Sequence, residues 1–201
     1  GSAACWGDDE FGQASAADES LEEVSAGYFH SCGLRADGSA VCWGLDDAGR
    51  TTPPDDRCSS LSAGWYHTCA LDEAGVVSCW GMDSEGQSSA PQQSFDEVSS
   101  GGVHTCARDE QGTVSCWGLD EDGQATPPLE SFVQVSAGAN HTCALSDAGE
   151  VQCWGRDTHG QCSAAEGSLV QVSAGLDHSC GVTAGGEVLC WGADTYGQAS
   201  P

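Results

Sequence analysis

Cysteine is the residue type that offers this chain the most chemistry, since 13 of its 201 residues are cysteines. Ten of them form five pairs whose members are ten residues apart. The pairs are Cys32 with Cys42, Cys69 with Cys79, Cys106 with Cys116, Cys143 with Cys153, and Cys180 with Cys190. Paired thiols serve either zinc binding or disulfide formation. Zinc sites favour pairs about two to four residues apart with a second pair nearby, so this spacing favours disulfides.

The segment inside each cysteine pair has the pattern of a tight β-hairpin. A glycine follows the midpoint in every case: Gly38, Gly75, Gly112, Gly149 and Gly186. This is typical of a three-residue loop whose last residue has a positive φ. Counting outward from such a loop puts the two cysteines opposite each other, with Cβ atoms about 4.5–5.5 Å apart. We therefore predict five disulfides, each worth roughly 2–3 kcal/mol, and an oxidising compartment, extracellular or at the cell surface.

Three cysteines fall outside the pairs. Cys58 occupies a position that other copies of the pattern fill with leucine or phenylalanine, which predicts a buried thiol. Cys162 replaces alanine or serine, and Cys5 lacks the partner strand of a hairpin. Because the total is odd, at least one sulfur is free or intermolecular. Self-association through these cysteines or through open edge strands is therefore one interpretation.

Histidine and aspartate also recur in register. The histidines are His30, His67, His104, His141 and His178. Such a set could bind a metal or switch with pH, but identical positions favour a structural role, with each ring hydrogen-bonded to backbone within or between units. The aspartates are Asp9, Asp46, Asp83, Asp120, Asp157 and Asp194, each three residues before a glycine. They could ligate calcium, yet their neighbours vary and no EF-hand spacing occurs, so we expect turns held by side-chain hydrogen bonds.

Catalysis finds little support in this pattern. Serine, histidine and aspartate abound, but as copies in equivalent environments, whereas an active site needs one asymmetric constellation. No glycine loop has the strand-to-helix context that cradles phosphate. We expect neither an enzyme nor a cofactor.

A single repeated unit positions all of these residues. Trp-Gly recurs at residues 6, 43, 80, 117, 154 and 191, always 37 residues apart, so the chain is one structural unit copied along itself. Segments around Val135, Cys143 and Val151 predict strands of about five residues, and the tryptophans are expected to pack between units. We predict one all-β domain over 1–201. Its parts are a half-unit at 1–16 and units of about 17–53, 54–90, 91–127, 128–164 and 165–201.

The charge balance restricts the partners. The chain has 31 acidic residues against five arginines and no lysine, which gives a formal net charge of -26. Nucleic acid binding needs a cationic footprint and is therefore excluded as a function class. Anionic membrane surfaces are disfavoured for the same reason, and no segment approaches the length of a membrane span. Cationic patches and divalent cations are the electrostatically suitable ligands.

The repeat resembles the regulator of chromosome condensation family. The matching stretches include Gly64-Trp65-Tyr66-His67-Thr68 and the segment from Trp117 to Gln124, Trp-Gly-Leu-Asp-Glu-Asp-Gly-Gln. The resemblance implies a β-propeller, in which small antiparallel sheets surround an axis. This unit is shorter than usual for the family, has Asp where Asn is common, and adds the cysteine pair.

The functions known in that family differ in how well they suit this chain. Guanine-nucleotide exchange fits an acidic, disulfide-rich chain poorly. Ultraviolet sensing would need more than one copy of the tryptophan motif. A secreted bacterial propeller that inhibits β-lactamases is the nearest analogue in size and compartment, although fold alone does not transfer its target.

The most informative residues break the repeat. Between Ala-Gly and His the first two units carry Tyr28-Phe29 and Trp65-Tyr66, whereas later units carry Gly102-Val103, Ala139-Asn140 and Leu176-Asp177. Aromatic residues gathered on one rim are the anchors that dominate protein interfaces. We therefore predict a secreted or cell-surface, non-catalytic protein-binding module, either an enzyme inhibitor or an adhesion or recognition domain. The alternative is a calcium-binding or other metal-binding structural surface protein that uses the acidic turns.

Overall fold

The computed structural model describes residues 1–16, 19–164 and 167–200, and its strands form five three-stranded antiparallel sheets. We call each sheet a blade. The blades are β1 (Glu23–Ala26), β2 (His30–Leu34) and β3 (Ala40–Gly44); β4 (Ser60–Ala63), β5 (His67–Leu71) and β6 (Val77–Gly81); β7 (Glu97–Ser100), β8 (His104–Arg108) and β9 (Val114–Gly118); β10 (Gln134–Ala137), β11 (His141–Leu145) and β12 (Val151–Gly155); and β13 (Leu169–Ala174), β14 (His178–Thr183) and β15 (Val188–Gly192). Within the described ranges no helix is long and apolar enough to cross a membrane.

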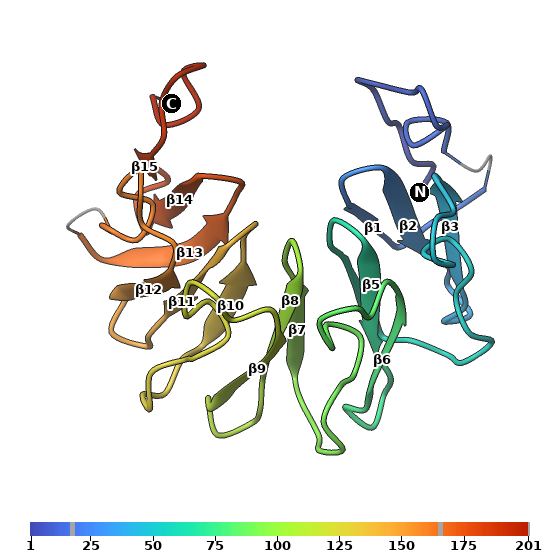
Figure 1. Ribbon diagram of the computed structural model, residues 1–201, viewed down its shortest axis with the longest axis horizontal. Helices are drawn as coiled ribbons and strands as arrows, with labels where there is room; N and C mark the ends of the chain where they lie inside the picture. The colour runs from blue at the N-terminus through green and yellow to red at the C-terminus, as the bar shows by residue number, and fades with distance from the viewer. Residues whose placement is uncertain (17–18, 165–166, 201) are drawn as a thin grey trace.

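The blades follow one another around an arc (Figure 1), as expected for a propeller. The first strands of successive blades contact each other, β1 with β4, β4 with β7, β7 with β10, and β10 with β13. Blade 1, in blue, and blade 5, in orange and red, flank the opening of the arc in Figure 1. The all-β propeller prediction is therefore confirmed. The unit boundaries stay a prediction, and residues 17–18, 165–166 and 201, which fall at unit ends, lie outside the described residues.

The hairpins have the predicted geometry. In blade 1, Arg35 N donates to Ser39 O at 3.0 Å and Gly38 N donates to Arg35 O at 2.9 Å, which leaves a three-residue loop. The five loop glycines have φ between 79° and 84°, a region that only glycine enters readily. The cysteines of each pair face each other in the strand register, with Cα atoms 4.0–4.1 Å apart, and all five disulfides are formed.

The hydrophobic core lies between blades rather than inside them, because a single three-stranded sheet has no interior of its own. Cys106 and Val114 of blade 3 pack with Phe132, Val135 and Ala144 of blade 4. The same arrangement recurs at the other three junctions. Cys58 takes the Phe132 position at the first junction and is buried there, as predicted. Its burial raises the pKa of the Cys58 thiol.

Each hairpin disulfide should carry a measurable share of the stability. Replacing both Cys106 and Cys116 by serine should lower the free energy of unfolding by about 2–3 kcal/mol, because an eleven-residue loop regains its entropy in the unfolded chain. Denaturant unfolding under oxidising conditions measures this. The control is Cys162→Ser, at a cysteine outside the disulfides. It should leave the denaturant concentration at the midpoint of unfolding nearly unchanged. Equal midpoints for the double variant and the wild type would contradict the prediction.

Candidate functional site

The repeated histidines are part of a hydrogen-bond network that crosses from blade to blade. His67 Nε2 lies 2.7 Å from Thr105 Oγ1 of the next blade, and Thr105 Oγ1 donates its proton to Gln87 O at 2.8 Å. Since that hydroxyl hydrogen is already used, His67 Nε2 carries a hydrogen and donates it to Thr105. His30, His104 and His141 make the equivalent contacts to Thr68, Thr142 and Ser179. The expected partner was backbone, and that detail was wrong: the partner is a hydroxyl group of the next blade.

The environment of these rings leaves no room for a metal. Burial lowers the pKa of His30, His67 and His141 to about 4 and that of His104 to about 3. Each Nδ1 is buried without a hydrogen-bond partner. Glycine backbone packs against this edge of the ring, so that a Cβ added to Gly101 would lie 2.8 Å from His104 Nδ1. The described residues contain no group of three or more His, Cys, Asp or Glu that could hold a metal ion.

The repeated aspartates hold turns by side-chain hydrogen bonds, as predicted; five of these turns follow a third strand, and the Asp9 turn lies before β1. Asp120 Oδ1 accepts from Ala125 N at 2.7 Å, and its Oδ2 accepts from Thr126 Oγ1 at 2.7 Å. The same pattern recurs at Asp9, Asp46, Asp83 and Asp194, and Asp157 makes the backbone contact. Hydrogen bonds from Ser15 and Ala14 lower the pKa of Asp9. These carboxylates therefore have a structural role.

The aromatic residues that break the repeat lie together. Ring centroids are 4.3 Å apart for Tyr28 and Phe29, 5.2 Å for Tyr28 and Trp65, and 6.1 Å for Trp65 and Tyr66. Phe11 extends the series, 5.3 Å from Phe29. We call these five residues the aromatic rim. Tyr28 is 53% exposed and Phe11 39%, so rings from three successive units form one continuous, partly exposed surface.

The rim borders a cavity where the blades converge. The cavity has a volume of about 240 Å³ and is lined by Tyr28, Trp65 and Leu176 together with Ala-Gly segments from the ends of the first strands. Small residues are required there: a Cβ on Gly27 would lie 2.3 Å from Gly64 O of the next blade. Backbone and small side chains thus form the walls, and the large rings stand at one side.

Arg50 lies beneath the rim, and the sequence prediction missed it. It is 1% exposed and occupies the position of Gln87, Gln124 and Gln161 in later units. Its Nε donates to Asp47 O at 2.8 Å, and its Nη2 lies 3.3 Å from Asp47 Oδ2. Nη1 donates to Trp65 O at 3.4 Å, and the guanidinium carbon is 5.4 Å from the centroid of Tyr66. One buried cation thus connects the acidic turn at Asp46 and Asp47 to the aromatic segment of the next blade.

The substitution by Arg50 changes the local backbone. In later units the glutamine Oε1 accepts from the amide two residues earlier, as Gln87 does from Glu85 N at 2.9 Å. A guanidinium cannot accept. The corresponding residue in the first complete unit, Ala48, has φ 61°, and it is the non-glycine residue with a positive φ in the described part of the chain. Such a conformation costs alanine about 1 kcal/mol. The backbone is therefore strained at Ala48, in the turn where Arg50 replaces glutamine.

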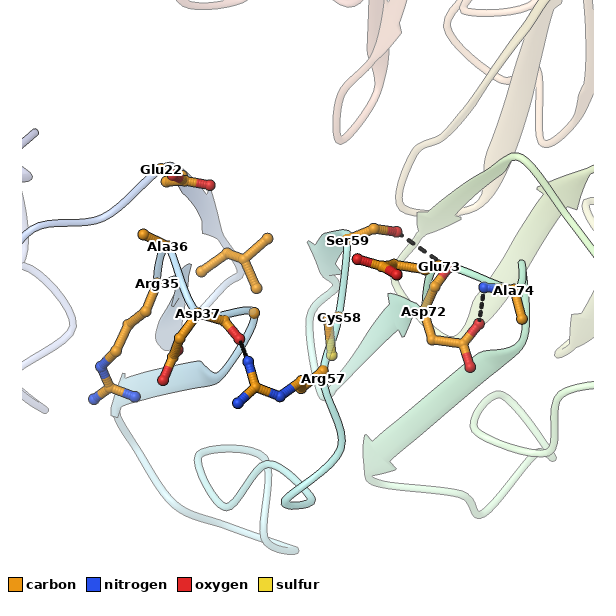
Figure 2. A pocket seen from close by; sticks show the side chains of 12 residues that line it. Glu22, Arg35, Ala36, Asp37, Arg57, Cys58, Ser59, Asp72, Glu73 and Ala74 are labelled. Atoms are coloured by element: carbon orange, nitrogen blue, oxygen red, sulfur yellow. Dashed lines mark hydrogen bonds between the residues drawn. The ribbon is translucent and has the colours of Figure 1, made fainter.

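A second cavity lies by the hairpin loops, and several of its charged side chains are hydrogen-bonded within the protein (Figure 2). Its volume is about 560 Å³, and both Arg35 and Arg57 line it. Figure 2 shows Arg57 donating to the Asp37 carbonyl and Asp72 accepting from Ala74 N. Arg35 pairs with Glu19, Nη2 to Oε1 at 2.9 Å. Because these charges are already engaged in loop structure, the aromatic rim is the stronger candidate site.

These features define a β-propeller whose blades are tied internally by disulfides and to each other by the histidine network. Residues 22–50, 58–87, 95–124, 132–161 and 169–198 match the family described as "Regulator of chromosome condensation (RCC1) repeat". The chain belongs to this family, and the resemblance noted in the sequence is confirmed. No curated protein matches it at the threshold applied.

Solved structures agree on the fold. The chain is 31% identical to the CRINKLY WD40 ectodomain of the Arabidopsis thaliana receptor kinase ACR4, with a TM-score of 0.70 and coverage of 86% of this chain and 63% of that one. It is 26% identical to the ectodomain of the Physcomitrella patens receptor kinase CR4, with a TM-score of 0.77 and coverage of 93% and 55%. Yeast RCC1 (Prp20) is 18% identical, with a TM-score of 0.73 and coverage of 87% of this chain and 56% of that one. At this identity the similarity supports only the shared fold. The chain therefore spans less than two thirds of each of these relatives.

The buried histidines should make the stability depend on pH. Their folded-state pKa values lie below the value of about 6.5 that histidine has in an unfolded chain. The unfolded chain therefore binds more protons between pH 6.5 and about 4, and stability is lost as the pH falls through that window. His104→Gln should reduce the slope of unfolding free energy against pH, near pH 5, by about 1.4 kcal/mol per pH unit.

Denaturant titrations between pH 4.5 and 7 measure this slope. The matched control is His159→Gln, because His159 is exposed and lies outside the inter-blade network. An unchanged slope in His104→Gln would show that protonation of this ring does not oppose folding.

Proposed function

We propose that this chain is a non-catalytic protein-binding module of an oxidising, extracellular environment and that the aromatic rim is its contact surface. The observation that carries the proposal is the clustering of Phe11, Tyr28, Phe29, Trp65 and Tyr66, of which Tyr28 and Trp65 line the cavity. Large aromatic side chains near the centre of an interface supply most of its binding energy. An enzyme inhibitor and an adhesion or recognition domain are both modules of this kind.

The location is supported by the disulfides and by the relatives. Five disulfides in one small domain persist where the surroundings are oxidising. The two plant proteins to which the chain is similar are described as receptor-kinase ectodomains. Both facts favour a module that works outside the cell or at its surface.

The way the reactive residue types are used supports a non-catalytic role. His67 and its three equivalents are buried donors between blades, and the repeated aspartates hold turns. Neither set is aimed at a cavity. The same hydrogen bonds occupy the carboxylate oxygens that calcium would need, so nothing in the described turns favours the calcium-binding alternative.

Replacing both Trp65 and Tyr66 by alanine should abolish capture of the partner. Cross-linking and affinity capture from the extracellular fraction of the source organism, followed by mass spectrometry, would identify proteins held by the wild type. With the purified partner, the double variant should bind at least about thirtyfold more weakly, as expected for loss of a contact worth 2 kcal/mol or more.

Asn140→Ala is the matched control, because Asn140 occupies the Tyr66 position in blade 4, away from the rim. It should capture the same proteins as the wild type. Thermal melting and circular dichroism check that both variants are folded. If a folded double variant retains the wild-type affinity, the rim is not the contact surface.

A further inference from the structure

We propose that the aromatic rim receives a cationic side chain, lysine or arginine, presented by a basic segment of the partner protein. This inference rests on the proposed function and adds the chemistry of the partner. The cation would lie against Tyr28 and Trp65, at the mouth of the cavity.

The electrostatics of the rim favour a positive ligand. The turn that carries Phe11 begins with Asp8, and Asp8 lines one cleft with Tyr28 and Phe29. The next two turns are hydrogen-bonded directly to the rim, Leu45 N to Phe29 O at 2.8 Å and Met82 N to Tyr66 O at 2.9 Å. Exposed carboxylates on these three turns are Asp8, Asp9, Glu10, Asp46, Asp47, Asp83 and Glu85.

No arginine side chain among the described residues is free to neutralise this region. Arg50 is buried, and its charge is offset by Asp47 at 3.3 Å. Arg35 and Arg57 line the cavity by the hairpin loops, at the other end of the strands. Arg108 and Arg156 pair with carboxylates in later blades. The rim therefore lies in a negative field that attracts basic segments and repels acidic ones.

The rings are suited to such a ligand. The faces of tryptophan and tyrosine attract lysine and arginine, with tryptophan the strongest. Arg50 already occupies a position 5.4 Å from the Tyr66 centroid, so Tyr28 and Trp65, tilted by 36° to each other with centroids 5.2 Å apart, are the faces left for a ligand. The adjoining cavity of about 240 Å³ has room for a single extended side chain.

The proposed cation site also gives the buried Arg50 a role. Its bond to Trp65 O and its position by Tyr66 hold the second aromatic pair in place from below. Arg50 precedes Trp65-Tyr66 in the chain, whereas Gln87, Gln124 and Gln161 precede segments without tryptophan or tyrosine. Gln13, however, precedes Tyr28-Phe29. Arg50 is therefore associated with the Trp65–Tyr66 pair and not with the whole rim.

A tetra-arginine peptide, with tetra-citrulline as its neutral analogue, tests the inference on the whole chain. Indole N–H signals in two-dimensional NMR report the position of binding. Tetra-arginine should shift the Trp65 signal and leave that of Trp117, whose Nε1 donates to Gln87 O at 2.9 Å. Tetra-citrulline should shift neither. Trp65→Leu should weaken tetra-arginine binding roughly five- to thirtyfold, and Glu10→Gln should weaken it more than Glu121→Gln, which lies on the blade 3 turn.

The outcomes separate this inference from the proposed function. Equal binding of tetra-arginine to the wild type and Trp65→Leu would show diffuse attraction to the acidic surface and overturn the inference. Capture of a partner that binds the rim through a neutral or acidic segment would also overturn it, while the proposed function stands. If tetra-arginine binds at Trp65 but the Trp65 and Tyr66 double variant still captures its partner, the cation site holds and the proposed function fails.

Discussion

The carbonyl oxygen at Gln87 and its equivalents is the acceptor on which the propeller depends. It accepts a hydrogen bond from the Thr105 hydroxyl at 2.8 Å and another from the Trp117 indole N–H at 2.9 Å, both on the next blade. The threonine hydroxyl in turn accepts from His67 of the preceding blade. Because each three-stranded sheet must bury its faces against neighbours, this buried set of bonds fixes the angle and distance at which the inter-blade core can form.

That network explains why abundance of reactive residue types is a poor guide to function in a repeat protein. Histidine, threonine, tryptophan and aspartate recur because the junctions and turns recur. Arg50 is informative for the opposite reason: it leaves the turn without its glutamine acceptor and strains Ala48 at φ 61°. Strain that the surrounding structure tolerates gathers at functional sites, and here the strained residue lies two positions before Arg50, which contacts Trp65 O and the Tyr66 ring.

The sequence predicted what depends on local spacing. The cysteine pairs and loop glycines specify the hairpins, and the Asp-to-Gly spacing specifies the turns, because each involves residues within about ten positions. The hydroxyl partner of His67 lies 38 residues away, and no local pattern distinguishes it from backbone. Arg50 was visible as a departure from glutamine, but its burial and its contact with Trp65 O require the packing of two blades. The closeness of Phe11 to Phe29 and the cavity beside Tyr28 likewise exist only in three dimensions.

The rigidity of this frame bears on how the rim would bind. Each blade is closed by a disulfide and fixed to its neighbours by buried hydrogen bonds, so the backbone that carries Tyr28 and Trp65 has little freedom to lose. The rings also pack against one another, with centroids 4.3–6.1 Å apart, and Arg50 donates a hydrogen bond to Trp65 O. Binding loses affinity when side chains and loops must be ordered. A preorganised rim would avoid most of that loss, which supports the proposal that this small aromatic surface is the contact surface.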